Sequence, residues 1–257
     1  MAQRVSRAFI DSNIDVFISS ADNDIELERR AIQAFLGRQV DGLVLIPCSE
    51  IASKDNVLLA DRTVMTVQFD RRVLSVPTRY VGCDNRHGMR LVVKHLRQDV
   101  DLERQPPFFI GAGTASSSGR ERLMAFKNAM PDAKFRSGSF SFEWGQKAVH
   151  DLIDTGTTAA TIVTAADVIA LGVIAGAQER GYRVPQDFRV IGFDDVGVSF
   201  LAHPSLTSVR QPVDKMTATI VEMVLERVSE GPGAIRGAKR VFKPDLIIRE
   251  SSPRREA

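Results

Sequence analysis

Short apolar runs alternate with amphipathic segments along most of the chain. Leu43–Ile46 is a continuous apolar run closed by Pro47, which is typical of a strand buried on both faces. Between residues 24 and 39, Ile32 and Phe35 recur at the spacing of one helix face. Runs of the first kind predict strands at residues 43–46, 65–69, 81–83, 107–110, 134–140, 160–164, 188–193 and 246–248. Helical spacing predicts helices at residues 24–39, after 84, and at 120–130, 145–154, 167–180 and 213–228. This alternation indicates an α/β fold with parallel sheets and helices on both faces.

Polar residues directly follow several of the predicted strands. Asp70, Asp84, the segment Gly111–Gly113 and the pair Asp194–Asp195 each stand just past a strand. In folds of this class, ligands bind outside the carboxyl ends of the strands. We therefore expect these residues to gather along strand-end rims.

Composition excludes several classes of function. The chain has 257 residues, 44% of them hydrophobic, which is enough for one large core or two lobes. A net charge of +2 gives no global field for nucleic acid or an anionic membrane. Cys48 and Cys83 follow apolar runs and form no CxxC motif, so we expect two buried thiols. Neither a signal peptide nor a membrane-length apolar run is visible, which predicts a soluble, cytoplasmic protein with no membrane partner.

The acids Asp194 and Asp195 could be a catalytic dyad, a metal site, a helix cap or a ligand anchor. Side chains of adjacent residues at a strand end point in opposite directions. A shared-proton dyad is therefore disfavoured, and we expect one acid to face a ligand while the other braces a loop. An ionised carboxylate can accept hydrogen bonds from two sugar hydroxyls.

The loop after residue 110 carries a second group of polar side chains. Gly111-Ala-Gly113 lacks the third glycine of a dinucleotide fingerprint, and no GxSxG motif is present. Arg120 and Arg122 follow near the start of a predicted helix, where a cation opposes the helix dipole. One of them is expected to serve another purpose there, although a purely surface role for both stays open.

Two further residues have both a structural and a functional interpretation. Asp70 can cap a turn or accept a ligand hydroxyl at the rim. Trp144, the only tryptophan, can pack in the core or stack on a sugar or base ring. The four histidines show no metal-binding spacing, and no motif indicates a nucleophile, so we predict no metal, no cofactor and no enzymatic activity.

The motifs taken together resemble the effector-binding core of lac repressor family transcription regulators. The resemblance rests on the order of several short segments that span residues 13–252. They are VDGLVLIP at 40–47, FDR at 69–71, VGCDN at 81–85, GRER at 119–122, ADVIALG at 166–172, GYRVPQD at 181–187, VIGFDD at 190–195, PSLTSVRQP at 204–212 and DLIIRES at 245–251.

The resemblance implies a type I periplasmic-binding-protein fold, in which two Rossmann-like lobes are joined by three crossovers and a ligand binds between the lobes. With crossovers near residues 83, 211 and 241, one lobe comprises 1–82 plus 212–241. The other comprises 83–211 plus 242–257. The segment from Val5 to Asp11 is similar to the end of the family's first helix. The first strand and its loop are therefore expected to be missing, which would leave the N-terminal lobe incomplete.

Family pocket positions transfer to this chain one residue at a time. Asp194 matches the ligand-binding aspartate, and Arg122 matches the arginine that holds effector hydroxyl or carboxylate groups. The remaining matches are Asp70 at the rim, Ser116 and Ser118 in the loop, and the aromatic Trp144. Many relatives have asparagine where this chain has Ala166, and Asp167 is expected to be a cap or a brace.

The family likeness implies a sensing domain that binds a small sugar or related polyol and controls DNA binding allosterically as a homodimer. Operator DNA would be contacted only through a helix-turn-helix domain that is not found in this sequence. The alternative is a solute-binding protein of a sugar transporter, which shares the fold. A third hypothesis, an α/β enzyme using Asp194 and Asp195, lacks any supporting motif.

Overall fold

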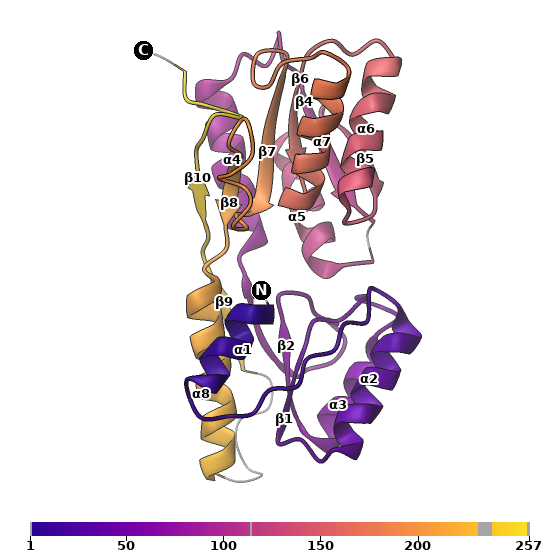
Figure 1. Cartoon of the computed structure of the whole chain (residues 1–257), viewed down its shortest axis with the longest axis vertical. Helices are drawn as coiled ribbons and strands as arrows, with labels where there is room; N and C mark the ends of the chain where they lie inside the picture. Colours follow the sequence, from indigo (N-terminus) through magenta and orange to yellow (C-terminus); the bar gives the residue numbers. More distant parts are fainter. Residues whose placement is uncertain (1, 114, 231–237, 256–257) are drawn as a thin grey trace. The chain divides into compact units, whose positions relative to one another are not determined.

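Helices covering parallel sheets account for the alternating pattern of the sequence. The computed structural model describes residues 2–113, 115–230 and 238–255. Contacts within the chain divide it into two units (Figure 1). Unit 1 comprises Met1–Cys83, Ala115–Ser118 and Pro212–Phe242, and unit 2 comprises Asp84–Thr114, Gly119–Gln211 and Lys243–Ala257. Residues 115–118, which the expected division assigns to the second lobe, group with unit 1.

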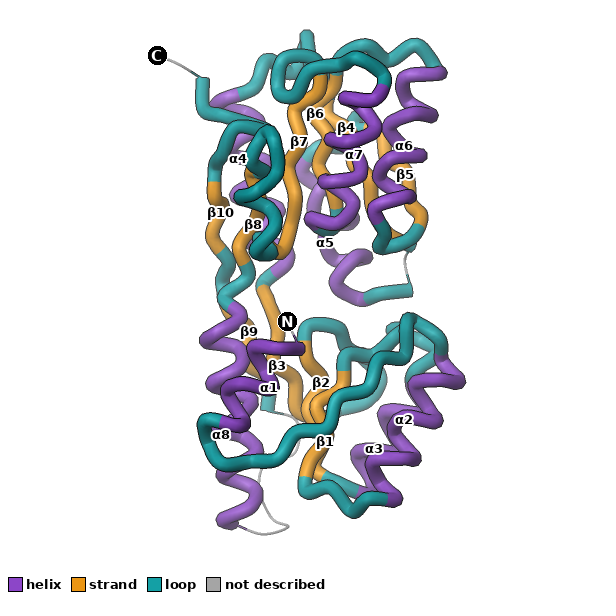
Figure 2. Tube along the Cα trace, in the orientation of Figure 1, coloured by secondary structure: helices purple, strands orange, loops and turns teal. Residues whose placement is uncertain are grey.

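Unit 1 is built on a four-stranded parallel sheet in the order β1-β2-β3-β9. Its strands are β1 (Gly42–Leu45), β2 (Met65–Phe69), β3 (Arg79–Cys83) and β9 (Lys239–Phe242). Its helices are α1 (Ala2–Ile10), α2 (Ile25–Gly37), α3 (Lys54–Thr63) and α8 (Val213–Glu230). Helix α8 packs against β2, β3 and β9, and α1 packs against α8 (Figure 2).

The core of unit 1 includes Ile32 of α2, Leu43 of β1 and Ala60 of α3, which pack together away from solvent.

The segment between α1 and α2 contributes no strand to the sheet, because residues 14–20 have no regular secondary structure. Phe17 and Ile18 in this segment are 61% and 60% exposed. Apolar side chains of this size therefore stay largely in water at one side of unit 1.

Unit 2 is built on a six-stranded sheet in the order β10-β8-β7-β6-β4-β5. Among the described strands of this sheet, β10 alone runs antiparallel, against β8. The strands are β4 (Pro107–Ala112), β5 (Lys134–Gly138), β6 (Ala160–Thr164), β7 (Phe188–Asp194), β8 (Thr207–Arg210) and β10 (Asp245–Ile247). The helices are α4 (Asn85–Asp99), α5 (Ser117–Ala129, whose first two residues count with unit 1), α6 (Phe142–Asp154) and α7 (Asp167–Glu179).

Helices α6 and α7 pack closely side by side because small residues line their contact. A Cβ atom on Gly145 would collide with the backbone of Ile169, and one on Gly172 with the backbone of Phe142. Strands β6 and β7 are almost entirely buried, as their apolar sequences predict. The rim of unit 2 is thus carried by a rigid central sheet.

The expected α/β class with parallel sheets is confirmed, and the strands predicted at 65–69 and 160–164 have the predicted bounds. Two helices begin earlier than predicted: α5 at Ser117 and α6 at Phe142, where Ser141 caps the first turn through the Trp144 N–H. Among the described helices, none has the length and apolar content needed to cross a membrane.

Candidate ligand-binding site

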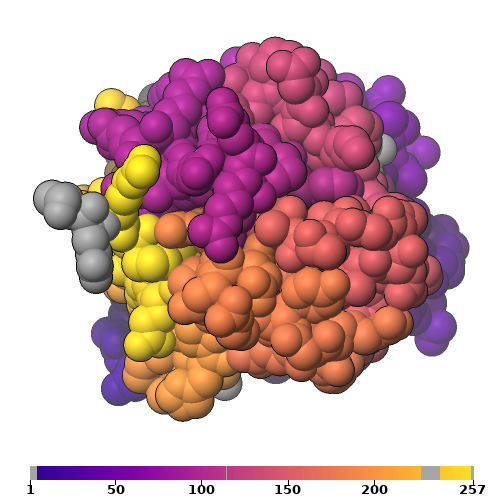
Figure 3. Space-filling view, turned by 90° about the horizontal axis from the view of Figure 1, so that it is seen from above, coloured from indigo at the N-terminus to yellow at the C-terminus, as the bar shows by residue number. Residues whose placement is uncertain are grey.

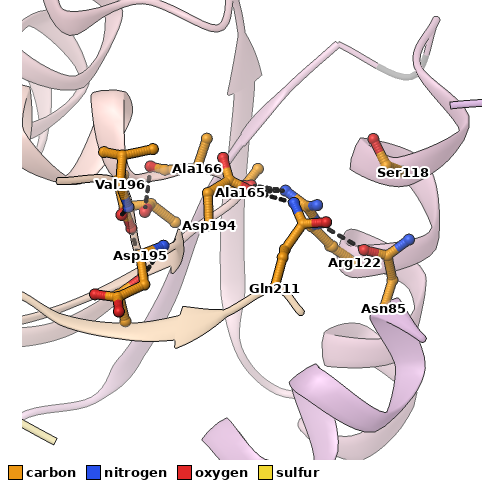
Figure 4. Close-up of polar contacts among 12 residues, drawn as sticks. Asn85, Ser118, Arg122, Ala165, Ala166, Asp194, Asp195, Val196 and Gln211 are labelled. Carbon is orange, nitrogen blue, oxygen red and sulfur yellow. Dashed lines mark hydrogen bonds and ion pairs between the residues drawn. The ribbon is translucent and has the colours of Figure 1, made fainter. Parts of the chain in front are cut away.

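The carboxyl edge of the unit 2 sheet brings together polar groups from five segments of the chain. Strand β7 lies between β6 and β8, all parallel, so their carboxyl ends meet at one edge. Asp194 ends β7, Ala165 follows β6 and Gln211 follows β8, while α4 and α5 supply Asn85 and Arg122. Figure 4 shows these side chains converging.

Arg122 is the buried centre of this group, with only 2% of its surface exposed. Its Nε donates to Asn85 Oδ1 at 2.8 Å, and its Nη1 donates to the Ala165 carbonyl at 2.7 Å. The guanidinium also lies 3.6 Å from the centroid of the Phe193 ring. A charge taken out of water is tolerated only when it is paired and hydrogen-bonded. These contacts fix the plane of the guanidinium. One of Arg120 and Arg122 was expected to serve a purpose other than surface charge, and these contacts give Arg122 such a purpose.

Asp194 is the partly exposed partner of Arg122, and its side chain keeps 28% of its surface in solvent. Its Oδ1 accepts from Arg122 Nη1 at 3.3 Å and from Gln211 Nε2 at 2.6 Å. The backbone of Asp194 has φ 112°, a conformation that non-glycine residues rarely adopt. A carboxylate held in this way is a preorganised acceptor for hydroxyl groups.

Asp195 makes an entirely different set of contacts. Its carboxylate pairs with Arg210 at 2.6 Å and with Arg249 at 2.7 Å, and its side chain is 4% exposed. The two neighbouring carboxylates point in different directions (Figure 4). Asp195 therefore braces the end of the sheet, and the structure offers no shared-proton dyad to Asp194.

Asp167, the first residue of α7, is a second brace behind the site. It is 1% exposed, and its Oδ2 accepts from the Val196 N–H at 2.9 Å. Burial, with a contribution from the nearby Asp194 charge, raises the pKa of Asp167 to about 7. At the preceding position Ala166 offers no side-chain hydrogen bond to the start of α7.

Trp144 lies on the same unit, near the carboxyl ends of β4 and β5. Its indole Nε1 donates to the Gly111 carbonyl at 2.9 Å, and its ring covers Gly138 so closely that a Cβ there would collide with it. The side chain is neither fully buried nor fully exposed. Its polar atom is thus committed to the fold, and its contribution to ligand binding stays a prediction.

The other three predicted residues belong to unit 1. Asp70 follows β2 with φ 60°, is 9% exposed, and its carbonyl accepts from the Tyr80 hydroxyl at 3.0 Å. Ser116 and Ser118 are both buried, and their Oγ atoms lie 3.1 Å apart. Of the six predicted residues, Arg122 and Asp194 contact each other in unit 2, and Ser116 and Ser118 contact each other in unit 1.

Sequence analysis did not single out Asn85 or Gln211 as site residues. Asn85 looked like part of a helix start, yet its Oδ1 fixes Arg122 while its Nδ2 donates to Glu121 at 2.9 Å. Gln211 is 4% exposed and lies at the end of the PSLTSVRQP segment. Its position just after β8 was a usable signal, since Asp194 and Ala165 also lie at the carboxyl ends of strands.

One arrangement in unit 2 has the composition of a catalytic triad. His95 contacts Asp99 through Nδ1 at 2.9 Å and Ser252 Oγ through Nε2 at 2.9 Å. Ser252 is fully buried, so no substrate can reach its hydroxyl. These contacts instead attach the C-terminal segment to α4, beside which it lies in Figure 3. Within the described residues, no group of three metal-ligating side chains occurs.

Comparison with known proteins gives one family match and many similar chains. Residues 107–252 match the model of the periplasmic binding protein-like domain. The chain is 27% identical to the HTH-type transcriptional repressor PurR of Haemophilus influenzae (strain PittEE), over 92% of this chain and 71% of that protein. It is 28% identical to the ribose operon repressor of Halalkalibacterium halodurans, over 92% of this chain and 70% of that protein.

The solved structures agree on the fold. A LacI family transcriptional regulator from Enterococcus faecalis V583 with bound ribose superposes with a TM-score of 0.83 and 23% identity. The match covers 99% of this chain and 93% of that one. The arrangement of helices and strands is therefore shared over nearly the whole chain.

Proposed function

The chain belongs to the family of periplasmic binding protein-like domains, and we propose that it is the effector-sensing domain of a transcription regulator of the lac repressor type. The observation that carries this proposal is the Arg122–Asp194 pair at the carboxyl edge of the unit 2 sheet. One member is buried and fixed, and the other is partly open to solvent. A ligand that meets this edge finds a carboxylate already oriented to receive it.

The ligand that fits this chemistry is a small sugar or related polyol. The Asp194 carboxylate can accept hydrogen bonds from vicinal hydroxyls, and Arg122 holds it in place. The name of the ribose operon repressor and the ribose bound to the Enterococcus regulator support a sugar as ligand. Asp70, Ser116, Ser118 and the ring of Trp144 are proposed as further ligand contacts on the strength of the family likeness.

Sensing requires that the ligand bind two states of the protein with different affinity. We propose that the chain acts as a homodimer in the cytoplasm, because operator half-sites mirror a two-fold axis. Operator DNA would then be contacted by a separate helix-turn-helix segment, of the kind that the name of the PurR relative records. Bound sugar would change the affinity of that segment for DNA.

A ligand screen tests the proposal directly. The purified chain would be exposed to ribose, cellobiose and other small sugars and polyols, with unfolding temperature and the fluorescence of Trp144 as readouts. We expect at least one sugar to raise the unfolding temperature, because a ligand that binds the folded state stabilises it by mass action. A chain that responds to none of these compounds would contradict the proposal.

The site is tested by Arg122→Ala with a matched control. Arg180→Ala removes an arginine from an ion pair with Asp154 of similar length, 3.1 Å, but on the exposed surface of the same unit. Arg122→Ala should weaken sugar binding and so raise Kd about 100-fold. Arg180→Ala should leave Kd unchanged. Equal affinity in both variants would show that the ligand binds elsewhere.

A further inference from the structure

The turn that follows β7 combines two unusual backbone conformations. Asp194 has φ 112° and Asp195 has φ 51°, although neither is glycine. Such conformations persist only where the surrounding structure holds them. The direction of the Asp194 side chain depends on this backbone, so whatever fixes the turn also fixes the proposed ligand acceptor.

The groups that hold the turn converge on a single carboxylate. The Val196 N–H donates to Asp167 Oδ2 at 2.9 Å, and the Ser199 hydroxyl donates to the same oxygen at 2.5 Å. The Ser208 hydroxyl donates to Asp167 Oδ1 at 2.6 Å and in turn accepts from the Asp195 N–H at 3.1 Å. Both N–H groups that follow Asp194 are therefore attached to Asp167, one directly and one through Ser208.

Burying a carboxylate of this kind is energetically unfavourable. Asp167 is 1% exposed, and Ser199 and Ser208 are fully buried. Within the described part of the chain, no ion pair compensates Asp167, and the charge that acts on it most is the like charge of Asp194. Hydrogen bonds from three donors are what make an ionised group tolerable there. An apolar residue would fill the same space without the free-energy cost of burying a carboxylate. This indicates that the hydrogen bonds of Asp167 are themselves required.

We propose that Asp167 is a positioning residue, whose carboxylate holds the turn at 194–199 in the conformation that presents Asp194 to the ligand. The effect on ligand binding rests on the proposed function, whereas the effect of Asp167 on the conformation of the turn does not. Asp167 does not itself touch the ligand. It acts through Ser208 and the backbone of Asp195 and Val196.

The variants separate positioning from stability. Asp167→Ala removes all three anchors, Asp167→Asn keeps the shape and one acceptor, and Ser208→Ala breaks only the link to Asp195. Ser251→Ala is the matched control, because Ser251 is an equally buried serine of unit 2 that bonds the Val190 carbonyl and the Thr207 N–H, away from the turn.

Two measurements on the full chain decide the matter. Hydrogen–deuterium exchange without ligand should show faster exchange of residues 195–199, by about tenfold or more, in Asp167→Ala and Ser208→Ala but not in Ser251→Ala. Titration with the best sugar from the screen should show Kd raised about tenfold or more in Asp167→Ala, largely restored in Asp167→Asn, and unchanged in Ser251→Ala.

Unchanged exchange at 195–199 in both Asp167→Ala and Ser208→Ala would overturn the inference, whatever the ligand is. Faster exchange with unchanged Kd would overturn it as well, because the turn would then not govern binding. If Asp167→Ala does not fold, Ser208→Ala carries both measurements alone. Failure of the wild-type chain to bind any sugar would contradict the proposed function instead, and would be visible separately from the exchange result.

Discussion

Both units end an inner strand on an aspartate with positive φ, but they hold it by different means. In unit 1, Asp70 follows β2, and main-chain contacts together with the Tyr80 hydroxyl fix its backbone. In unit 2, Asp194 ends β7, and side chains from α5, α7 and the segment after β8 hold the residue and its turn. A backbone clamp survives most substitutions, whereas a side-chain clamp depends on each of its members. The comparison therefore predicts that unit 2 is the more sensitive to single changes at its rim.

The largest expected effect on stability comes from Asp195. In Asp195→Ala the guanidinium of Arg249, 16% exposed, and that of Arg210 lose their carboxylate. Removing one partner of a mostly buried ion pair leaves an uncompensated charge, so we expect a loss of about 3 kcal/mol in the free energy of unfolding. Urea denaturation measures it. Asp154→Ala, which breaks an exposed pair with Arg180, should change the same quantity by less than about 1 kcal/mol. A similar loss in both variants would remove the distinction between rim and surface.

The pH dependence of stability should depend on Asp167. Folding raises its pKa from 3.8 to about 7, so between these values the folded chain binds a proton that the unfolded chain does not. Stability therefore falls as the pH rises from 4 to 7, by on the order of 3 kcal/mol from this group. The unfolding free energy should be measured across this range for the wild type and for Asp167→Asn. Between pH 4 and 7 it should fall by that amount more in the wild type than in Asp167→Asn. Parallel curves would show that Asp167 does not titrate in this window.

The smallest effect is expected where the contacts that hold the Asp70 backbone in unit 1 lose the Tyr80 hydroxyl. Tyr80→Phe removes the hydroxyl that donates to the Asp70 carbonyl, and the main-chain bond from the Asp70 N–H to the Val81 carbonyl remains. We expect a loss of about 1 kcal/mol in stability, the usual net value of one hydrogen bond. Sugar affinity should stay within about threefold of wild type. A larger loss of affinity would show that sugar binding is as sensitive to single changes around Asp70 as to those around Asp194.

Much of the fold followed from periodicity, because buried parallel strands are short apolar runs with few polar interruptions. Strands β6 and β7 are of this kind. Helix α3 was not predicted, since its sequence KDNVLLADRT buries only a narrow face, represented by Val57 and Ala60. Strand β9 was also missed, because KRVF is largely exposed at the edge of its sheet and no burial pattern marks it.

The site was predictable only in part, and for a physical reason. Strand-end position and the unfavourable place of a cation at a helix start drew attention to the pairs Asp194–Asp195 and Arg120–Arg122, and the family resemblance selected Asp194 and Arg122 from them. The role of Ser208 could not be foreseen, since a serine inside a strand does not reveal that its hydroxyl relays an N–H to a carboxylate 41 residues away. Such networks arise from packing between elements, and local sequence carries no sign of it.

The central claim is that the Asp194 carboxylate, held by Arg122 and Gln211, anchors the ligand. Isothermal titration of the best sugar from the screen into the wild type and into Asp194→Asn tests it most directly. The account predicts a Kd raised about tenfold or more in a variant that still folds, because asparagine keeps the shape of the side chain and one oxygen that can accept from Gln211 but loses the charge. An unchanged Kd in a folded Asp194→Asn variant would contradict it.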